Sequence, residues 1–254
     1  MRQVLELDED FELTSDGLSV DEDFVERGVN EWDTYSLEEA LAIKDDVGAE
    51  VVAVTVGDDE ADEVLLTCLA KGADRAIRVA RAANETFDPL VTARLLSAVV
   101  ERESPDLVLC GVQASDTVNG ATGAALAGLT GLSCVAVVRA IELSGEGVAT
   151  VERELEGGIV EVLELKLPVV LTVQTGISEP RYATLRAIKQ ARDKPLDVLS
   201  SGELGLDDAA IEQVAGARLR RLDVPQDEGH AELFEGDAAA VAERIAELIG
   251  ERLS

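Results

Sequence analysis

The segment Leu107 to Ala127 reads LVLCGVQASDTVNGATGAALA and predicts a strand, a glycine-bearing loop and a helix, in that order. Its first four residues are apolar, glycines surround the polar stretch Gln113 to Asn119, and Ala124 to Leu129 suits a helix. The free amides and the dipole at a helix start favour a phosphate, and glycine lets a ligand approach the backbone. On these residues alone a purely structural loop is an equal alternative.

Upstream of that segment, strand-like apolar runs alternate with amphipathic helices. This order predicts an α/β fold with a doubly wound parallel sheet and helices on both faces, Rossmann-like and suited to nucleotides. Ligands in such sheets bind at the carboxyl ends of the strands, so the loops at Trp32, Gly57 and Asp116 should share one edge. The expected strands are Glu50–Val56 and Ala76–Val79, and the expected helices follow a capping box at Ser36–Glu39 or span Ala61–Ala70 and Pro89–Arg102.

The two ends of the chain have a different pattern. Residues Met1 to Val29 are acidic and we expect them to be irregular. After Val135, short β-like segments separated by glycines predict antiparallel hairpins at Ala136–Leu143, Val148–Glu154 and Ile159–Leu165, followed by a buried strand at Val169–Val173. We therefore expect a nucleotide-binding domain over 1–200 and a C-terminal arm over 201–254, which is extended from Gly202 to Gly236. Its final helix, Ala238–Leu253, should pack on a partner subunit or back on the core.

Acidic residues outnumber basic ones by 52 to 22, which gives a net charge of −30 over 254 residues. Because the acids are spread along the whole chain, nucleic acid is an improbable partner. Dispersed acidity with few lysines is typical of a halophilic surface, kept soluble in very high salt. An acidic face that docks a basic partner is the alternative.

The sequence offers no recognisable catalytic or metal-binding groups. Cys68, Cys110 and Cys134 are widely spaced and His230 is the one histidine, so neither a disulfide framework nor a zinc site is expected. Phosphate-loop, nucleophile-elbow and zinc-protease motifs are absent. Acidic residues follow Met1 where a signal peptide would be apolar, so we expect a cytoplasmic protein without membrane insertion.

Several motifs run in order from about Asn30 to Leu206. They are NEWD at Asn30–Asp33, VAVTVG at Val52–Gly57, LAKGADR at Leu69–Arg75, DLVLCG at Asp106–Gly111 with Gln113, Ala114 and Asp116, ELKLPVV at Glu164–Val170, and EPRYATL at Glu179–Leu185. Taken together they resemble the beta subunit of electron transfer flavoprotein, the FixA-type family. EPRYATL is the most specific of them.

The resemblance implies an electron carrier and not an enzyme. Such a beta subunit binds AMP, pairs with an alpha subunit that carries most of the FAD site, and relays electrons from acyl-CoA or other dehydrogenases to a quinone oxidoreductase. Carried over by position, the nucleotide site comprises Asn30, Glu31, Trp32, Asp33, Val56, Asp116, Thr117, Val118, Asn119, Gly120, Ala121, Thr122, Gly123, Ala124, Ala125, Leu126 and Ala127. The partner-docking segment comprises Glu179, Pro180, Arg181, Tyr182, Ala183, Thr184 and the apolar anchor Leu185, with Arg186 and Lys189 as a basic patch beside it.

Two departures from the family pattern leave alternatives open. The family usually begins with a strand of the type KxLVxVK that this sequence lacks, so either the chain starts upstream of Met1 or its sheet lacks one strand. Ala121 stands where relatives often have Gln, which leaves fewer polar side chains in the lining of the loop.

In electron-bifurcating relatives a second FAD occupies the AMP site. A nucleotide-dependent ligase or hydrolase and a non-redox nucleotide-binding regulatory module are the remaining alternatives.

Overall fold

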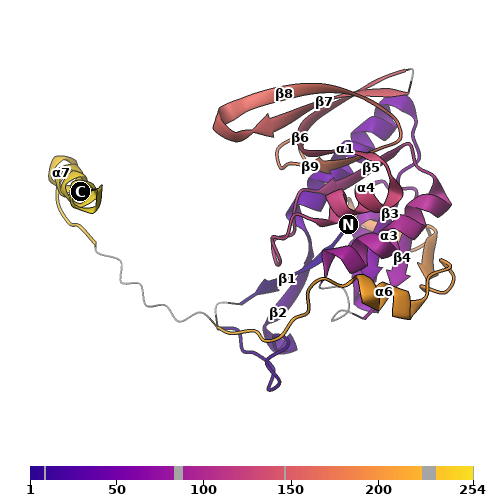
Figure 1. Cartoon of the computed structure of the whole chain (residues 1–254), viewed down its shortest axis with the longest axis horizontal. Helices are drawn as coiled ribbons and strands as arrows, with labels where there is room; N and C mark the ends of the chain where they lie inside the picture. The colour runs from indigo at the N-terminus through magenta and orange to yellow at the C-terminus, as the bar shows by residue number, and fades with distance from the viewer. Residues whose placement is uncertain (9, 83–87, 146, 225–232, 254) are drawn as a thin grey trace. The chain divides into compact units, whose positions relative to one another are not determined.

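Figure 1 shows a computed structural model of the chain, which describes all residues except 9, 83–87, 146, 225–232 and 254. The chain divides into two compact units, Met1–Leu222 and Asp223–Ser254, and each is described by itself. The first unit contains the sheets and the helices that cover them, and the second contains one helix, α7, at Ala238–Leu253. His230, the one histidine of the sequence, lies outside the described residues.

The first sheet consists of parallel strands in the order β10-β4-β3. On one face of this sheet, an apolar cluster joins β3 to α1 and α2. On the other face, a second cluster joins Ile77 and Val79 of β4 to α3 and α6. Leu37 and Leu41 of α1 and Leu65 of α2 belong to the first cluster. Helices therefore bury both faces, which explains why β3 is a nearly continuous apolar run. The elements are α1 (Glu31–Val47), β3 (Val52–Gly57), η2 (Asp59–Ala61), α2 (Asp62–Lys71), β4 (Arg75–Ala80), α3 (Pro89–Glu103), β10 (Leu196–Leu199) and α6 (Asp208–Val214).

The second sheet has the order β5-β9-β6-β7-β8, in which β5, β9 and β6 are parallel and β7 and β8 are antiparallel. Val169 to Val173 of β9 are buried at every position, whereas Leu107 to Gly111 of β5 are only half-buried. Within the described chain, β3 and β5 thus each keep one edge without a partner strand. The elements are β5 (Leu107–Gly111), α4 (Thr122–Thr130), β6 (Ser133–Ser144), β7 (Val148–Leu155), η4 (Glu156–Gly158), β8 (Ile159–Lys166), β9 (Val169–Val173) and α5 (Leu185–Ala191).

This architecture confirms the predicted fold class, with parallel strands flanked by helices and antiparallel hairpins after Val135. The helices that end at Gly72 and begin at Pro89 are confirmed as well. The parallel strands are divided between two sheets, since no β3–β5 pairing exists among the described residues.

The expectation that residues Met1 to Val29 are irregular is wrong. β1 (Gln3–Leu7) and β2 (Val25–Val29) form an antiparallel ribbon with the one-turn helix η1 (Glu22–Phe24) before the second strand. Val4 is the one buried residue of β1, so this acidic segment lacks the alternation that would have revealed a strand.

The expected capping box at Ser36 is also wrong, because α1 begins five residues earlier, at Glu31. Asn30 is the N-cap residue, and the Ser36 hydroxyl donates to the Trp32 carbonyl inside the helix at 3.1 Å. In the arm, Gly202–Gly236 is not extended throughout, because α6 interrupts it. Asp207 caps α6 by accepting the Ala209 amide. This capping residue is visible in the sequence, but the acidic composition of the arm led to the expectation of an extended segment.

Candidate functional site

A cavity of about 100 Å³ lies where β3 and β5 end, at the carboxyl edge that the topology predicts for a ligand. This space is below the roughly 300–1,000 Å³ of a typical ligand site, so a nucleotide would extend into the open mouth. Predicted site residues in its lining are Asn30, Asp33, Val56, Thr117, Asn119, Gly120, Ala121 and Thr122. The other lining residues are Met1, Arg2, Pro89, Thr92, Leu96, Cys110, Gly111, Val112, Gln113 and Ala114.

Asn30 and Asp33 tie the start of α1 to the loop after β5. The Asp33 carboxylate accepts the Gly111 amide at 2.9 Å and the Asn30 side-chain amide at 3.2 Å. Asn30 in turn donates to the Gln113 carbonyl at 2.8 Å and accepts the Ser115 amide at 3.2 Å. Because both side chains are buried, these bonds define the wall of the cavity.

The loop that follows reaches α4 through unusual backbone conformations. Val118 has a φ of 52° and Gly120 a φ of 58°, and a β-branched residue in that region is a strained outlier of the kind found at functional sites. No side chain caps α4 at Ala121. Its first amides therefore keep the free donors and the positive dipole end that bind anions.

Gly123 is required for packing. A Cβ at this position would lie 2.5 Å from Thr172 Cγ2 and 2.8 Å from Cys110 Sγ, so even Ala would collide with β9 and β5. Leu126 and Ala127 are buried in the core. None of the residues from Gly123 to Ala127 lines the cavity.

The remaining predicted residues lie around the cavity. Glu31 is exposed at the start of α1, and Trp32 donates from its indole nitrogen to Gln174 Oε1 at 3.1 Å. Val118 is exposed, and Asp116 forms an ion pair with Arg2 at 2.7 Å.

Sequence reasoning missed the contribution of α3 and of the N-terminus to this lining. Pro89, Thr92 and Leu96 come from the first half of α3, and the predicted βα order places that helix start at the same edge. Arg2 had no such signal, because its segment was expected to be irregular.

The cavity also contains a thiol that is unsuited to nucleophilic chemistry. Burial raises the pKa of Cys110 to about 12, so the group is a neutral thiol near pH 7. Among the described residues no cluster of His, Cys, Asp and Glu could hold a metal ion, and no helix combines the length and apolarity that a bilayer span needs.

One residue of the EPRYATL segment binds the rest of the subunit, and two of its side chains extend into solvent. Arg181 donates from its backbone and from Nε to the buried Glu38 carboxylate of α1, at 2.8 and 2.9 Å. Beyond it, Tyr182 is 97% exposed and Leu185 is 81% exposed. The Thr184 hydroxyl caps α5 by accepting the Ala187 amide. A large aromatic and a large aliphatic side chain are thus held in solvent by an ordered backbone.

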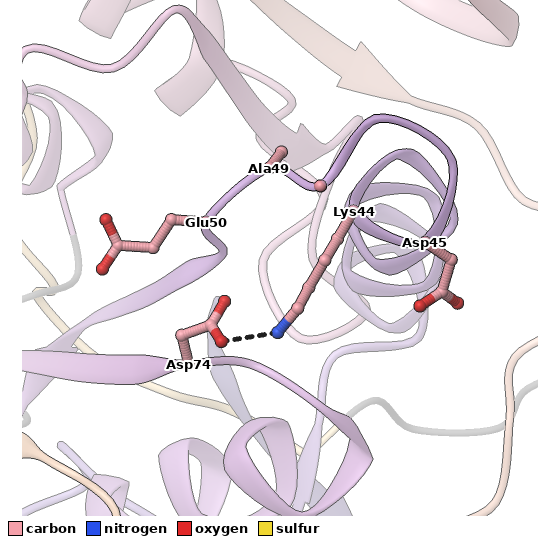
Figure 2. A pocket seen from close by; sticks show the side chains of 6 residues that line it. Lys44, Asp45, Ala49, Glu50 and Asp74 are labelled. Carbon is pink, nitrogen blue, oxygen red and sulfur yellow. Dashed lines mark hydrogen bonds and ion pairs between the residues drawn. The ribbon is translucent and has the colours of Figure 1, made fainter.

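A larger hollow, of about 550 Å³, lies where α1 ends, and Figure 2 shows the side chains that line it. It lies at the amino ends of β3 and β4, opposite the edge at which such sheets bind ligands. Its charged side chains already have partners: Lys44 pairs with Asp74, Asp45 with Arg181 and Glu50 with Arg75. Despite its size, we therefore assign no function to it.

Comparisons with known proteins agree with the resemblance. Residues 17–204 match the model of the electron transfer flavoprotein domain. An electron transfer flavoprotein subunit beta from Methylophilus methylotrophus is 44% identical over 256 residues, which cover 99% of this chain and 96% of the relative. The subunit beta of Bos taurus is 36% identical over 82% of each chain. That of Bacillus subtilis is 31% identical over 91% of this chain and 88% of its own length.

Proposed function

The chain belongs to the family of electron transfer flavoprotein beta subunits, and on that premise we propose that it binds AMP in the cavity between β3 and β5. It helps an alpha subunit to hold FAD, and the heterodimer relays electrons from acyl-CoA or other dehydrogenases to a quinone oxidoreductase in the cytoplasm. The nucleotide-binding part spans 1–200, and the arm over 201–254 packs on the alpha subunit through α7.

The observation that carries this proposal is the meeting of three features at one sheet edge. The cavity lies at the carboxyl ends of β3 and β5, the uncapped start of α4 faces it through Ala121 and Thr122, and the loop is held by hydrogen bonds to the buried Asn30. Such a rigid set of amide donors suits a phosphate group. The proposed role in electron transfer is supported by the relatives, which are electron transfer flavoprotein beta subunits.

The EPRYATL segment supports the partner part of the proposal. Exposed apolar side chains on an ordered backbone are the usual anchors of protein interfaces, and Tyr182 and Leu185 have this form. Arg181 acts in this proposal as the anchor of the segment, since Glu38 and Asp45 already engage its guanidinium.

Mass spectrometry of nucleotides released from the purified heterodimer tests the nucleotide assignment. We expect AMP and FAD in equal amounts. Two FAD and no AMP would replace this proposal with the bifurcating alternative. The absence of any flavin, with an adenine nucleotide present, would favour the regulatory module.

A pair of substitutions at Gly120 tests the location. Asp and Asn are the side chains that best tolerate the φ of 58° at this position, and they differ in charge and not in shape. Gly120→Asp should expel AMP by repelling its phosphate, whereas Gly120→Asn should keep most of it. Equal AMP content in the two variants, at equal folded fraction, would place the phosphate elsewhere.

A further inference from the structure

In a protein with a net charge of −30, a cation at the binding site would offset the repulsion that a bound phosphate meets. Three charged groups occur among the described residues that line the cavity: the Met1 ammonium, the Arg2 guanidinium and the Asp33 carboxylate. The ammonium donates to the Val54 carbonyl at 2.9 Å, and Asp33 accepts from backbone and side-chain amides. Arg2 is therefore the cation of the cavity that can serve a ligand.

Hydrogen bonds hold both the backbone and the side chain of Arg2. Its backbone amide donates to Asp33 Oδ2 at 2.9 Å, and its carbonyl accepts the Asn30 amide at 3.0 Å. Its Nε and Nη2 donate to the Asp116 carboxylate at 3.0 and 2.7 Å, across 114 residues of sequence. The side chain of Arg2 remains 31% exposed and that of Asp116 18% exposed.

This ion pair engages only one edge of the guanidinium. An Arg side chain has five N–H donors in a planar fork, and Asp116 takes those of the Nε and Nη2 edge. Within the described residues, Nη1 of Arg2 has no protein acceptor. A second planar edge is thus available, and this geometry matches two oxygens of a phosphate.

We infer that Arg2 receives the phosphate of the bound adenine nucleotide through its Nη1 and Nη2 edge, and that Asp116 is a positioning residue that orients the guanidinium. The inference rests on the proposed nucleotide function, and it makes Arg2 the residue that selects a phosphorylated nucleoside. Arg2 approaches the loop from the N-terminal segment and Thr122 belongs to the uncapped helix start, so the phosphate is held by a cation and by backbone amides together.

The test compares AMP with adenosine, which has the same base and sugar but no phosphate. Both are titrated calorimetrically, at one fixed salt concentration, into the full-length chain stripped of its nucleotide. Arg2→Ala should weaken AMP binding by on the order of 10- to 100-fold, the range for a charge-assisted hydrogen bond, and leave adenosine binding unchanged. Arg2→Lys should recover part of the loss, since it restores the charge and not the fork.

Arg27→Ala is the matched control, because it removes one positive charge from β2, where Arg27 pairs with Glu22 and Glu60 outside the cavity lining. It should bind AMP like the wild type. The double variant Arg2→Ala/Asp116→Ala distinguishes a direct contact between Arg2 and the phosphate from a role in which Arg2 only neutralises the charge of Asp116. We expect it to bind AMP as weakly as Arg2→Ala does.

Three results would overturn the inference while leaving the proposed function intact: wild-type AMP affinity in Arg2→Ala, equal losses for AMP and adenosine, or full recovery of AMP binding in the double variant. The last would mean that Arg2 only cancels the charge of Asp116. A wild-type chain that binds neither AMP nor adenosine would overturn the inference and the proposed function together.

Discussion

The Asp33 carboxylate accepts the Gly111 amide at 2.9 Å, and this bond holds the first turn of α1 against the end of β5. The two backbones approach so closely that a Cβ on Gly111 would lie 2.6 Å from Trp32 Cβ and 3.0 Å from the Asp33 nitrogen. The contact between Asp33 and Gly111, which forms part of the cavity wall, therefore requires glycine at position 111.

The first prediction concerns that contact. Gly111→Ala should destabilise the chain by about 2 kcal/mol or more, because the obstructing atoms are backbone atoms and a Cβ whose position the backbone fixes, so none of them can rotate away. Gly128→Ala is the control, since its Cβ would meet nothing within 4 Å on α4 and Ala favours a helix. Urea unfolding followed by Trp32 fluorescence measures both. Equal stability of the two variants would contradict the close approach.

Much of this fold could be predicted from local patterns. Val52 to Val56 is an apolar run because helices cover both faces of its sheet, and Gly72 ends α2 as its position indicates. Such signals lie within a few residues of one another, so a sequence displays them directly.

The site depends on contacts that no local pattern displays. Asp33 meets Gly111 across 78 residues and Arg2 meets Asp116 across 114, so neither pair is visible before the chain folds. Gly123 illustrates a second limit. A glycine beside a loop is compatible with a ligand or with packing, and only the nearby Thr172 side chain identifies packing as the reason.

The second prediction concerns salt. Because 52 acidic residues are spread over the chain, their repulsion should be strongest at 0.01 M, where the screening length is ~30 Å, and weak in molar salt. The melting temperature should therefore rise from 0.01 to 1 M KCl. A melting temperature independent of KCl would remove the halophilic interpretation and favour an acidic face that docks a basic partner.

The third prediction concerns the thiols. Burial raises the pKa of Cys68 and of Cys110 to about 12, whereas an unfolded thiol ionises near 8.5. The folded state therefore binds more protons above pH 8.5, and the stability that these thiols contribute is complete below that pH and is lost as the pH rises toward 12.

Labelling of the isolated chain with a thiol reagent at pH 8 checks this assignment. The exposed Cys134 should react first, the half-buried Cys110 in the cavity lining more slowly, and the buried Cys68 only on unfolding. Cys134→Ser serves as the control and should leave no fast phase. Three thiols that react at one rate in the folded chain would show that Cys68 is accessible and contradict this assignment.

The fourth prediction concerns partner docking by Leu185, which is 81% exposed. Leu185→Ala should leave the melting temperature and flavin content of the heterodimer unchanged, because the side chain adds little to the core of its own subunit. Loss of an apolar anchor at the centre of an interface costs on the order of 2 kcal/mol, or roughly 30-fold in affinity. The rate of reduction by a partner dehydrogenase at low concentration should fall accordingly.

Leu18→Ala provides the comparison, since it removes the same atoms from another exposed leucine, in the turn that precedes β2. It should transfer electrons like the wild type. Glu38→Gln adds an independent probe, because it weakens the contact with Arg181 that holds the segment while Leu185 itself stays intact. This variant should also reduce the transfer rate, by less than Leu185→Ala does. Wild-type transfer in Leu185→Ala would refute the docking role, and loss of folding in that variant would show that Leu185 contributes to the core.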